Sequence, residues 1–89
     1  GKHDPELMAT CQHGLGSLQL LLGDNNKALK MLEKALKTHQ DYLHAKDPLL
    51  ACIHVALSQV HEQTANITQA LEHAEKAYDN ASMTILPHY

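Results

Sequence analysis

The sequence predicts an all-α fold: an α-α superhelix made of two helix-turn-helix repeats, with about four antiparallel helices. Composition gives the first indication, because the chain is rich in Leu and Ala, has no Phe or Trp, and carries its three prolines at segment edges. Apolar residues also recur every three or four positions, as they do on one face of a helix. Finally, the residue pattern repeats after 42 positions, which is typical of stacked helical arrays.

Length and charge restrict the function classes. A chain of 89 residues is expected to form one domain that buries roughly 60–65% of its unfolded surface. The formal charge is -3, with seven Lys, no Arg and ten acidic residues. This balance provides no basic surface for nucleic acid or an anionic membrane, and no apolar run is long enough to span a bilayer.

The first repeat, about residues 5–46, opens with a helix-start signal. Asp4 is expected to cap the first helix, and Pro5 occupies a position where its missing N–H costs nothing. Gly23 is expected to end that helix in the left-handed conformation, and Asp24 to cap the second helix. The predicted buried stripes are Leu7, Cys11, Leu15, Leu18 and Leu22 on the first helix, and Ala28, Leu29, Leu32, Ala35 and Leu36 on the second.

The second repeat, about residues 47–83, begins with the same Asp-Pro signal at Asp47 and Pro48. Residues 39–46 either extend the second helix or form a connector. Asn66 and Gln69 are a plausible capping pair for the fourth helix, and residues 84–89 are expected to be an irregular tail. The predicted apolar faces are Leu50, Ile53, Leu57 and Val60 on the third helix, and Ile67, Ala70, Leu71, Ala74, Ala77 and Tyr78 on the fourth.

The duplication places bulky and small residues at matching positions. A shift of 42 brings Leu15 onto Leu57 and Gly16 onto Ser58. Large side chains provide buried volume, while small ones allow paired helices to cross closely. The small residues expected at the helix crossings of the first repeat are Gly14, Gly16, Ala28 and Ala35.

These residues resemble the signature of the tetratricopeptide repeat family over roughly residues 5 to 80. The matching positions are Leu15, Gly16, Gly23, Ala28, Leu32 and Ala35 in the first copy, and Leu57, Ser58, Ala65, Ala70 and Ala77 in the second. The 42-residue spacing exceeds the family's usual 34. In its length and its Asp-Pro opening, the repeat is similar to the kinesin-light-chain type.

The chain departs from the family pattern at several positions. Bulky aromatic residues are replaced by Gln12, Gln19, His54 and His61. The asparagine ladder that grips a peptide backbone in kinesin light chains is missing, with Gly14 and Ala56 at the matching positions. His13 and Ser17 stand where a carboxylate clamp would have basic and asparagine residues.

The resemblance implies a partner-binding groove on the concave surface, formed by the first helix of each repeat. The implied residues are Thr10, His13, Ser17, Leu20 and Leu21 in the first copy, and Cys52, Val55, Gln59, Glu62 and Gln63 in the second. Leu20 and Leu21 lie off the predicted buried stripe, so one or both should be exposed. Either a partner or a neighbouring repeat would then cover them.

Eight histidines are unusual in a chain of this length. His54 and His61 share a helix face but lie about 10 Å apart along the axis, too far for one zinc ion. An HExxH motif also fails, because Ala65 stands where its second His would be. Zinc binding by Cys11, Cys52 and a histidine is the remaining alternative, but we expect no metal or cofactor, with His54 and His61 serving as partly buried helix–helix spacers.

Catalytic patterns are scarce. His61 with Glu62 and His73 with Asp79 could be drawn as acid–base pairs, but no nucleophile or cofactor motif accompanies them, so no enzyme is predicted. We expect a cytoplasmic protein-binding module or adaptor that takes a peptide segment or partner helix in its groove. The rival hypothesis is a structural repeat of a larger scaffold that packs on neighbouring repeats or self-associates through its ends, since about three repeats are usually needed for stability.

Overall fold

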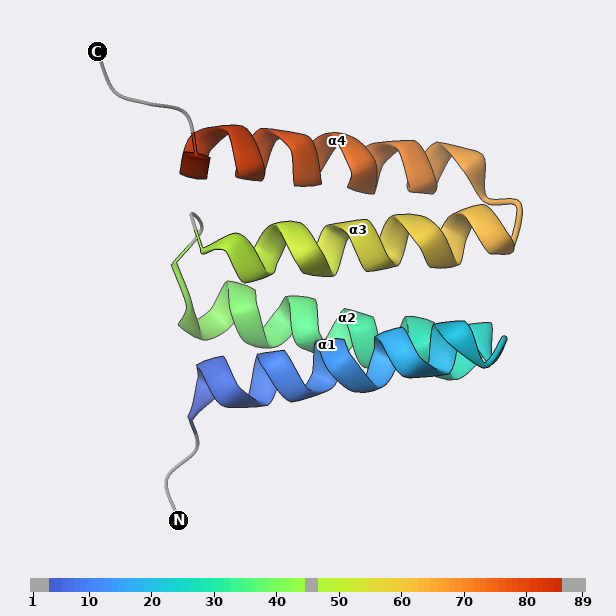
Figure 1. The fold of residues 1–89 in the computed structure, drawn as a ribbon, viewed down its shortest axis with the longest axis horizontal. Coiled ribbons are helices and arrows are strands. Elements are labelled where there is room, and N and C mark those ends of the chain that lie inside the picture. The colour runs from blue at the N-terminus through green and yellow to red at the C-terminus, as the bar shows by residue number, and fades with distance from the viewer. Residues whose placement is uncertain (1–3, 45–46, 86–89) are drawn as a thin grey trace.

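Four helices make up the computed structural model, which describes residues 4–44 and 47–85. They are α1 (Pro5–Leu21), α2 (Asn25–Tyr42), α3 (Pro48–Gln63) and α4 (Ile67–Ile85), and they lie side by side in chain order (Figure 1). The described residues contain no strand, so the all-α prediction is confirmed. The α4 helix continues to Ile85, beyond the boundary predicted at residue 83, and Pro87 lies outside the described residues.

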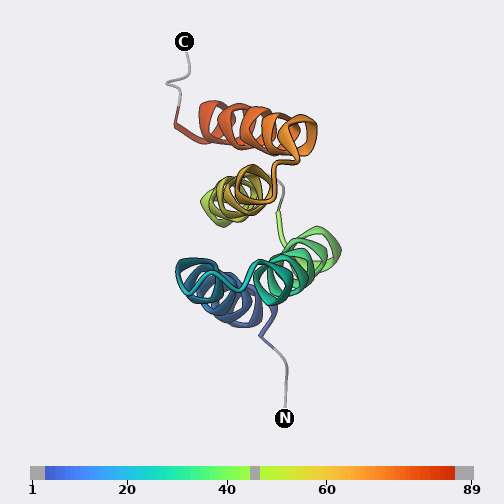
Figure 2. The ribbon, with the colours of Figure 1, turned by 90° about the vertical axis from the view of Figure 1, so that its right-hand side faces the viewer.

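The helices pair into two hairpins, α1 with α2 and α3 with α4, which share the most extensive contacts. The second hairpin packs on the first through α3, which contacts both α2 and α1. Figure 2 shows α3 stacked on the first hairpin, with α4 farther along the stack. The result is a slab with extents of 42 × 38 × 18 Å.

The predicted helix starts are confirmed. The Asp4 carboxylate accepts hydrogen bonds from the backbone N–H groups of Glu6 and Leu7, at 3.1 and 3.2 Å. Asp24 and Asp47 accept equivalent bonds from Lys27 and Leu49. Each bond satisfies a donor that would otherwise have no partner in the first helical turn.

The two turns within the hairpins are built alike. Gly23 ends α1 with a φ of 82°, and Ala65, which is 42 residues later, takes a φ of 62° in the turn after α3. Ala65 carries a side chain in a conformation that glycine adopts more easily. The Asn66 amide donates a hydrogen bond to the Gln69 side-chain oxygen just beyond this turn, so these two residues pair through their side chains.

The core lies mainly between α2 and α3, and it includes or contacts every residue of the apolar faces predicted for those helices except Leu50, which is half-buried and outside the cluster. Its buried members are Leu20, Ala28, Leu32, Ala35, Ile53, Ala56, Leu57 and Val60, with Leu29, Leu36 and Leu49 packed against them. On α4, by contrast, only Ala70 and Ala77 of the predicted face are buried, and Ala74 is exposed. Ile67, Leu71 and Tyr78 are exposed.

The stripe predicted to be buried on α1 is exposed, so that prediction was wrong. Leu7 and Leu18 are each 60% exposed, Leu22 is 83% exposed, and Cys11 and Leu15 are also exposed. The buried face of α1 is formed instead by Ala9, Gly16 and Leu20. Periodicity identified an apolar face correctly, but α2 packs against the face with small residues because they permit closer approach.

Gly16 marks the closest crossing of α1 and α2. A Cβ atom added at Gly16 would lie 2.7 Å from the Cγ atom of Leu32 and 2.9 Å from its Cδ2 atom. Gly14 has no such neighbour within 4 Å, so its expected role at a crossing was wrong. Ala28 and Ala35 are fully buried, as predicted.

Gly16→Ala should destabilise the fold, whereas Gly14→Ala should stabilise it. Alanine gains about 1 kcal/mol over glycine in a helix interior, and both positions receive that gain. At Gly16 the added methyl must displace the buried Leu32, at an overpacking cost of about 1–3 kcal/mol. Urea unfolding of the two variants measures the difference, and equal stability in both would contradict a tight crossing at Gly16.

Candidate functional site

A groove runs between α1 and α3 and has a volume of about 330 Å³. It is lined by His13 and Ser17 from α1, and by Ala51, Cys52, Val55, Ala56 and Gln59 from α3. His13 and Ser17 share one face of α1 because they are four residues apart. Cys52, Val55 and Gln59 share a face of α3 through the equivalent spacing of three and four.

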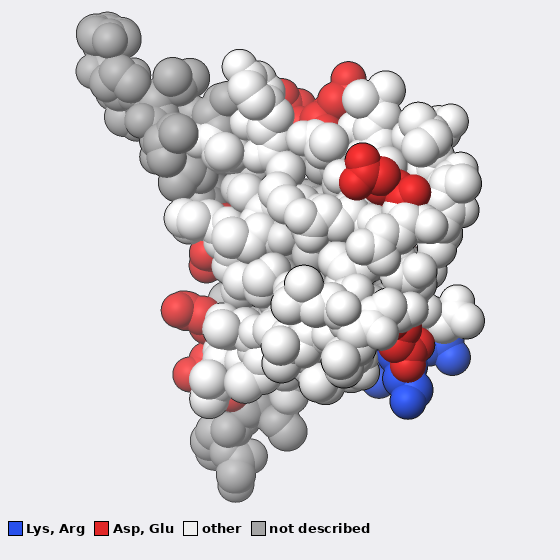
Figure 3. Space-filling model, turned by 45° about the vertical axis from the view of Figure 1, so that its right-hand side comes forward, with Lys and Arg blue, Asp and Glu red and all other residues white. Residues whose placement is uncertain are grey.

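The groove is open and largely neutral. Val55 is 47% exposed at its surface, while Ala56 is buried. Each of the two helices that form it contains one acidic residue, Glu6 in α1 and Glu62 in α3, and neither contains Lys. Figure 3 shows that the molecule is mostly uncharged on the side where α1 and α3 lie, with basic side chains at one edge. The groove therefore offers apolar contact with a few neutral polar groups.

Five of the ten residues predicted for partner binding line this groove together: His13, Ser17, Cys52, Val55 and Gln59. Gln63 is exposed and is not among the lining residues. Leu20 does not line the groove, because it is 7% exposed and belongs to the core. Leu21 is 83% exposed and is not among the lining residues. The expectation that one of these two leucines would be exposed holds for Leu21 only.

Thr10 and Glu62 also lie apart from the groove. The Thr10 hydroxyl donates to the Glu6 carbonyl oxygen at 2.8 Å, within its own helix. Glu62 lines a separate hollow with Ile67 and Leu71, between α3 and α4. Two lining residues, Ala51 and Ala56, were not predicted from the sequence. Their small side chains, before and after Val55 in the chain, were the signal that could have identified them.

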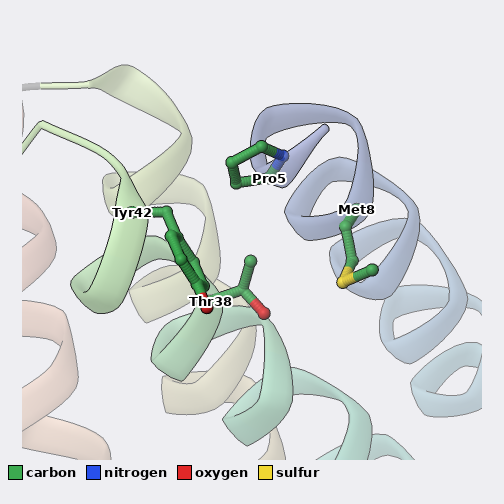
Figure 4. A pocket seen from close by; sticks show the side chains of 4 residues that line it. All are labelled: Pro5, Met8, Thr38 and Tyr42. Carbon is green, nitrogen blue, oxygen red and sulfur yellow. The ribbon is translucent and has the colours of Figure 1, made fainter. Parts of the chain in front are cut away.

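A second hollow, of about 400 Å³, lies within the first hairpin. Figure 4 shows Thr38 and Tyr42 on α2 across from Pro5 and Met8 on α1. The Thr38 hydroxyl donates to the Gln12 side chain at 3.0 Å. Sequence reasoning did not predict this hollow. Its residues come from the start of α1 and the end of α2, which are far apart in the chain although the two helices are consecutive.

Three histidines stack between α3 and α4. The His73 ring lies 5.0 Å from that of His54 and 5.6 Å from that of His61, measured between ring centroids. The Nδ1 atoms of His54 and His73 are 2.8 Å apart, at hydrogen-bond distance. His54 and His61 are 5% and 7% exposed, so these spacers are buried more completely than the sequence predicted.

Burial and neighbouring cationic groups favour the neutral forms of His54 and His73. Burial lowers the pKa of His54 to about 4, with further contributions from His73, Lys76 and His39. The pKa of His73 is lowered chiefly by burial and then by His61 and Lys76, while Glu72 acts in the opposite direction. Burial also lowers the pKa of His39, partly offset by Asp47.

The geometry of the histidine stack does not suit a metal ion. The planes of His61 and His73 are within 3° of parallel, so their faces meet and their nitrogens do not converge on one point. Among the described residues, no group of three His, Cys, Asp or Glu side chains is placed to hold a metal. Cys11 and Cys52, considered above as zinc ligands, are free and exposed.

A family model described as tetratricopeptide repeat matches residues 6–82. The chain belongs to the tetratricopeptide repeat family. Comparisons with curated proteins and with solved structures gave no match. Tetratricopeptide repeats are generally non-catalytic modules that mediate protein–protein interaction. Within the described residues, no helix is both long and apolar enough to cross a membrane.

The histidine stack should make this tetratricopeptide domain less stable in acid. The folded state holds the pKa of His54 near 4, so unfolding lets it bind a proton more readily below its ordinary value of 6.5. Its contribution is therefore complete above pH 6.5 and is lost as the pH falls toward 4, by roughly 3 kcal/mol in total. Unfolding free energies from urea titrations between pH 7.5 and 4 would measure this loss.

Replacing His54 by Gln isolates this effect, because the first repeat carries Gln12 at the matching position. His54→Gln should flatten the pH dependence of the unfolding free energy relative to the parent chain. Val55→Gln, at the next and exposed position of α3, should keep the parental slope. Parallel curves for the parent and His54→Gln would rule out a buried neutral His54.

Proposed function

We propose that this domain binds a protein segment, either an extended peptide or a partner helix, in the groove between α1 and α3. The observation that supports this function is the meeting of five expected contact residues in one open groove. Membership of the family supports the class of partner, since its repeats generally bind proteins. The domain then acts as a recognition module in an adaptor or scaffold.

The groove's chemistry selects a neutral partner segment with at least one apolar side chain. Val55, Ala51 and Ala56 give an apolar surface, and their small side chains leave room for a larger residue from the partner. Ser17 and Gln59 offer hydrogen bonds at the edges of that surface. A strongly acidic or basic segment would find no opposite charge among the lining residues.

Two further features of the chain support finer parts of this proposal. The 42-residue spacing supports placing the domain with the long repeats of the kinesin-light-chain type. The exposed, free thiols of Cys11 and Cys52 support a reducing compartment such as the cytoplasm. The rival hypothesis, packing of the repeat ends on neighbours, concerns the outer faces of α1 and α4 and not the groove.

Val55→Asp should abolish or strongly weaken binding in the groove. A displayed random-peptide library can be selected on the parent chain and counter-selected on this variant, with affinities then measured by fluorescence anisotropy. A charge placed on the apolar surface should reduce affinity at least about tenfold, or 1.4 kcal/mol. Because Val55 is 47% exposed, circular dichroism should show the helix content of the parent chain.

Leu71→Asp is the matched control, since Leu71 is also exposed but lies on α4 outside the groove. It should bind the selected peptides as the parent does. Bound peptide should also slow the labelling of Cys52, which lines the groove, and leave Cys11 reactive. Peptides that bind the parent and Val55→Asp equally well would overturn the groove assignment.

A further inference from the structure

The two ends of the helical stack each expose an apolar stripe. On α1, Leu7, Cys11, Leu15 and Leu18 recur at intervals of three and four residues, and all are exposed. Such spacing puts them on one face of the helix. A continuous row of large exposed apolar residues of this kind marks an interaction surface.

A second stripe lies on α4, at the opposite end of the stack (Figure 1). It is formed by Ile67, Leu71, Ala74 and Tyr78, with the three larger residues 59–73% exposed. The buried face of α4 is separate and contains Ala70 and Ala77. The stripe is therefore free to pack on another surface while α4 stays attached to α3.

The repeat shows how these stripes fit together, because their equivalents already meet inside the chain. A shift of 42 carries the α1 stripe onto Leu49, Ile53, Leu57 and Val60 of α3. The reverse shift carries Leu71, Ala74 and Tyr78 onto Leu29, Leu32 and Leu36 of α2, while Ile67 falls on the polar Asn25 at the start of α2. All seven apolar equivalents belong to the core between α2 and α3 or pack against it.

We propose that the α4 stripe of one molecule packs against the α1 stripe of a second copy of this chain, in the arrangement that α2 and α3 adopt internally. The contact continues the established α2–α3 interface across the boundary between two molecules. Because the two stripes are different surfaces, the association is heterologous and adds molecules end to end. It goes beyond the proposed function, since neither stripe contains a residue that lines the groove.

The second copy is favoured because its stripe preserves the size balance of the internal interface. Relative to α2, α4 is smaller at one position, where Ala74 replaces Leu32, and larger at another, where Tyr78 replaces Leu36. Relative to α3, α1 likewise has Cys11 in place of Ile53 and Leu18 in place of Val60. Losses and gains of volume thus occur on both sides of the contact, which favours a repacked version of the same interface.

Charge does not oppose this contact. The α1 helix carries one acidic residue, Glu6, at its first turn. On α4, Glu72, Lys76 and Asp79 are separated from the stripe by the helical periodicity, and Glu75 lies at its edge. Most of the contact area is therefore apolar on both molecules.

Sedimentation velocity over a range of concentrations tests the proposal on the 89-residue chain. The parent should form a series of species that grows with concentration and exceeds the dimer, or closes into a ring. Leu18→Asp places a charge in the α1 stripe and Leu71→Asp places one in the α4 stripe, so each alone should weaken association at least tenfold. Both positions are about 60% exposed, so circular dichroism should show folded variants.

An equimolar mixture of the two variants gives the sharpest result. Leu18→Asp retains its α4 stripe and Leu71→Asp retains its α1 stripe, so the pair should form a heterodimer that grows no further. Val55→Asp, altered only in the groove, should self-associate as the parent does. This control separates failure of end-to-end packing from failure of the proposed peptide groove.

The two native thiols provide a measurement without any substitution. Cys11 lies in the α1 stripe and Cys52 in the groove, and both are exposed. Raising the protein concentration should slow alkylation of Cys11 while leaving Cys52 reactive. A chain that stays monomeric at high concentration, a single variant that still associates fully, or protection of Cys52 instead of Cys11 would each overturn the proposal.

Discussion

The close approach of α1 to α2 at Gly16 is the constraint on which the remaining arrangement depends. Without a side chain at Gly16, Leu32 can lie fully buried beneath α1. Leu32 belongs to the same core cluster as Ile53, Leu57 and Val60, the buried face of α3. The close crossing keeps the first hairpin compact, so α3 packs on α2 and also contacts α1. The groove lies where α1 and α3 meet.

The two hairpins have different interiors although their sequences align. The second has Ala74 in the position of Leu32, so it lacks the large buried leucine of the first. Its interior volume comes partly from the rings of His54, His61 and His73, which stack between α3 and α4. A ring stack satisfies some polar atoms and fills space, but its stability depends on the neutral state of His54 and His73. Both hairpins therefore depend on proton concentration, the second through the stacked His54 and His73 and the first through the buried His39 of α2.

The sequence was sufficient to predict the helices, their caps and the duplication. The helices and caps depend on local signals such as Asp4-Pro5, Asp47-Pro48 and Gly23. It was not sufficient to say which apolar face is covered. The α1 helix has two, a leucine stripe and a narrower face with Ala9, Gly16 and Leu20, and helical periodicity favours the wider one. Only the packing of α2 shows that the narrower face is buried. For the same reason, Leu20 was predicted to line the groove, whereas it belongs to the core.

Charge is distributed by helix in a way that connects the groove to the ends of the stack. In the described part of the chain, α2 and α4 carry most of the charged side chains, whereas α1 and α3 each carry one acid. Charged residues on α2 and α4 keep those helices solvated on their outward faces. The nearly uncharged α1 and α3 form surfaces that lose little solvation free energy when water is removed from them. Residues of α1 line the groove and also form an end stripe. The two proposed partners would therefore contact separate faces of α1, because His13 and Ser17 line the groove with α3 and Leu18 is exposed in the end stripe.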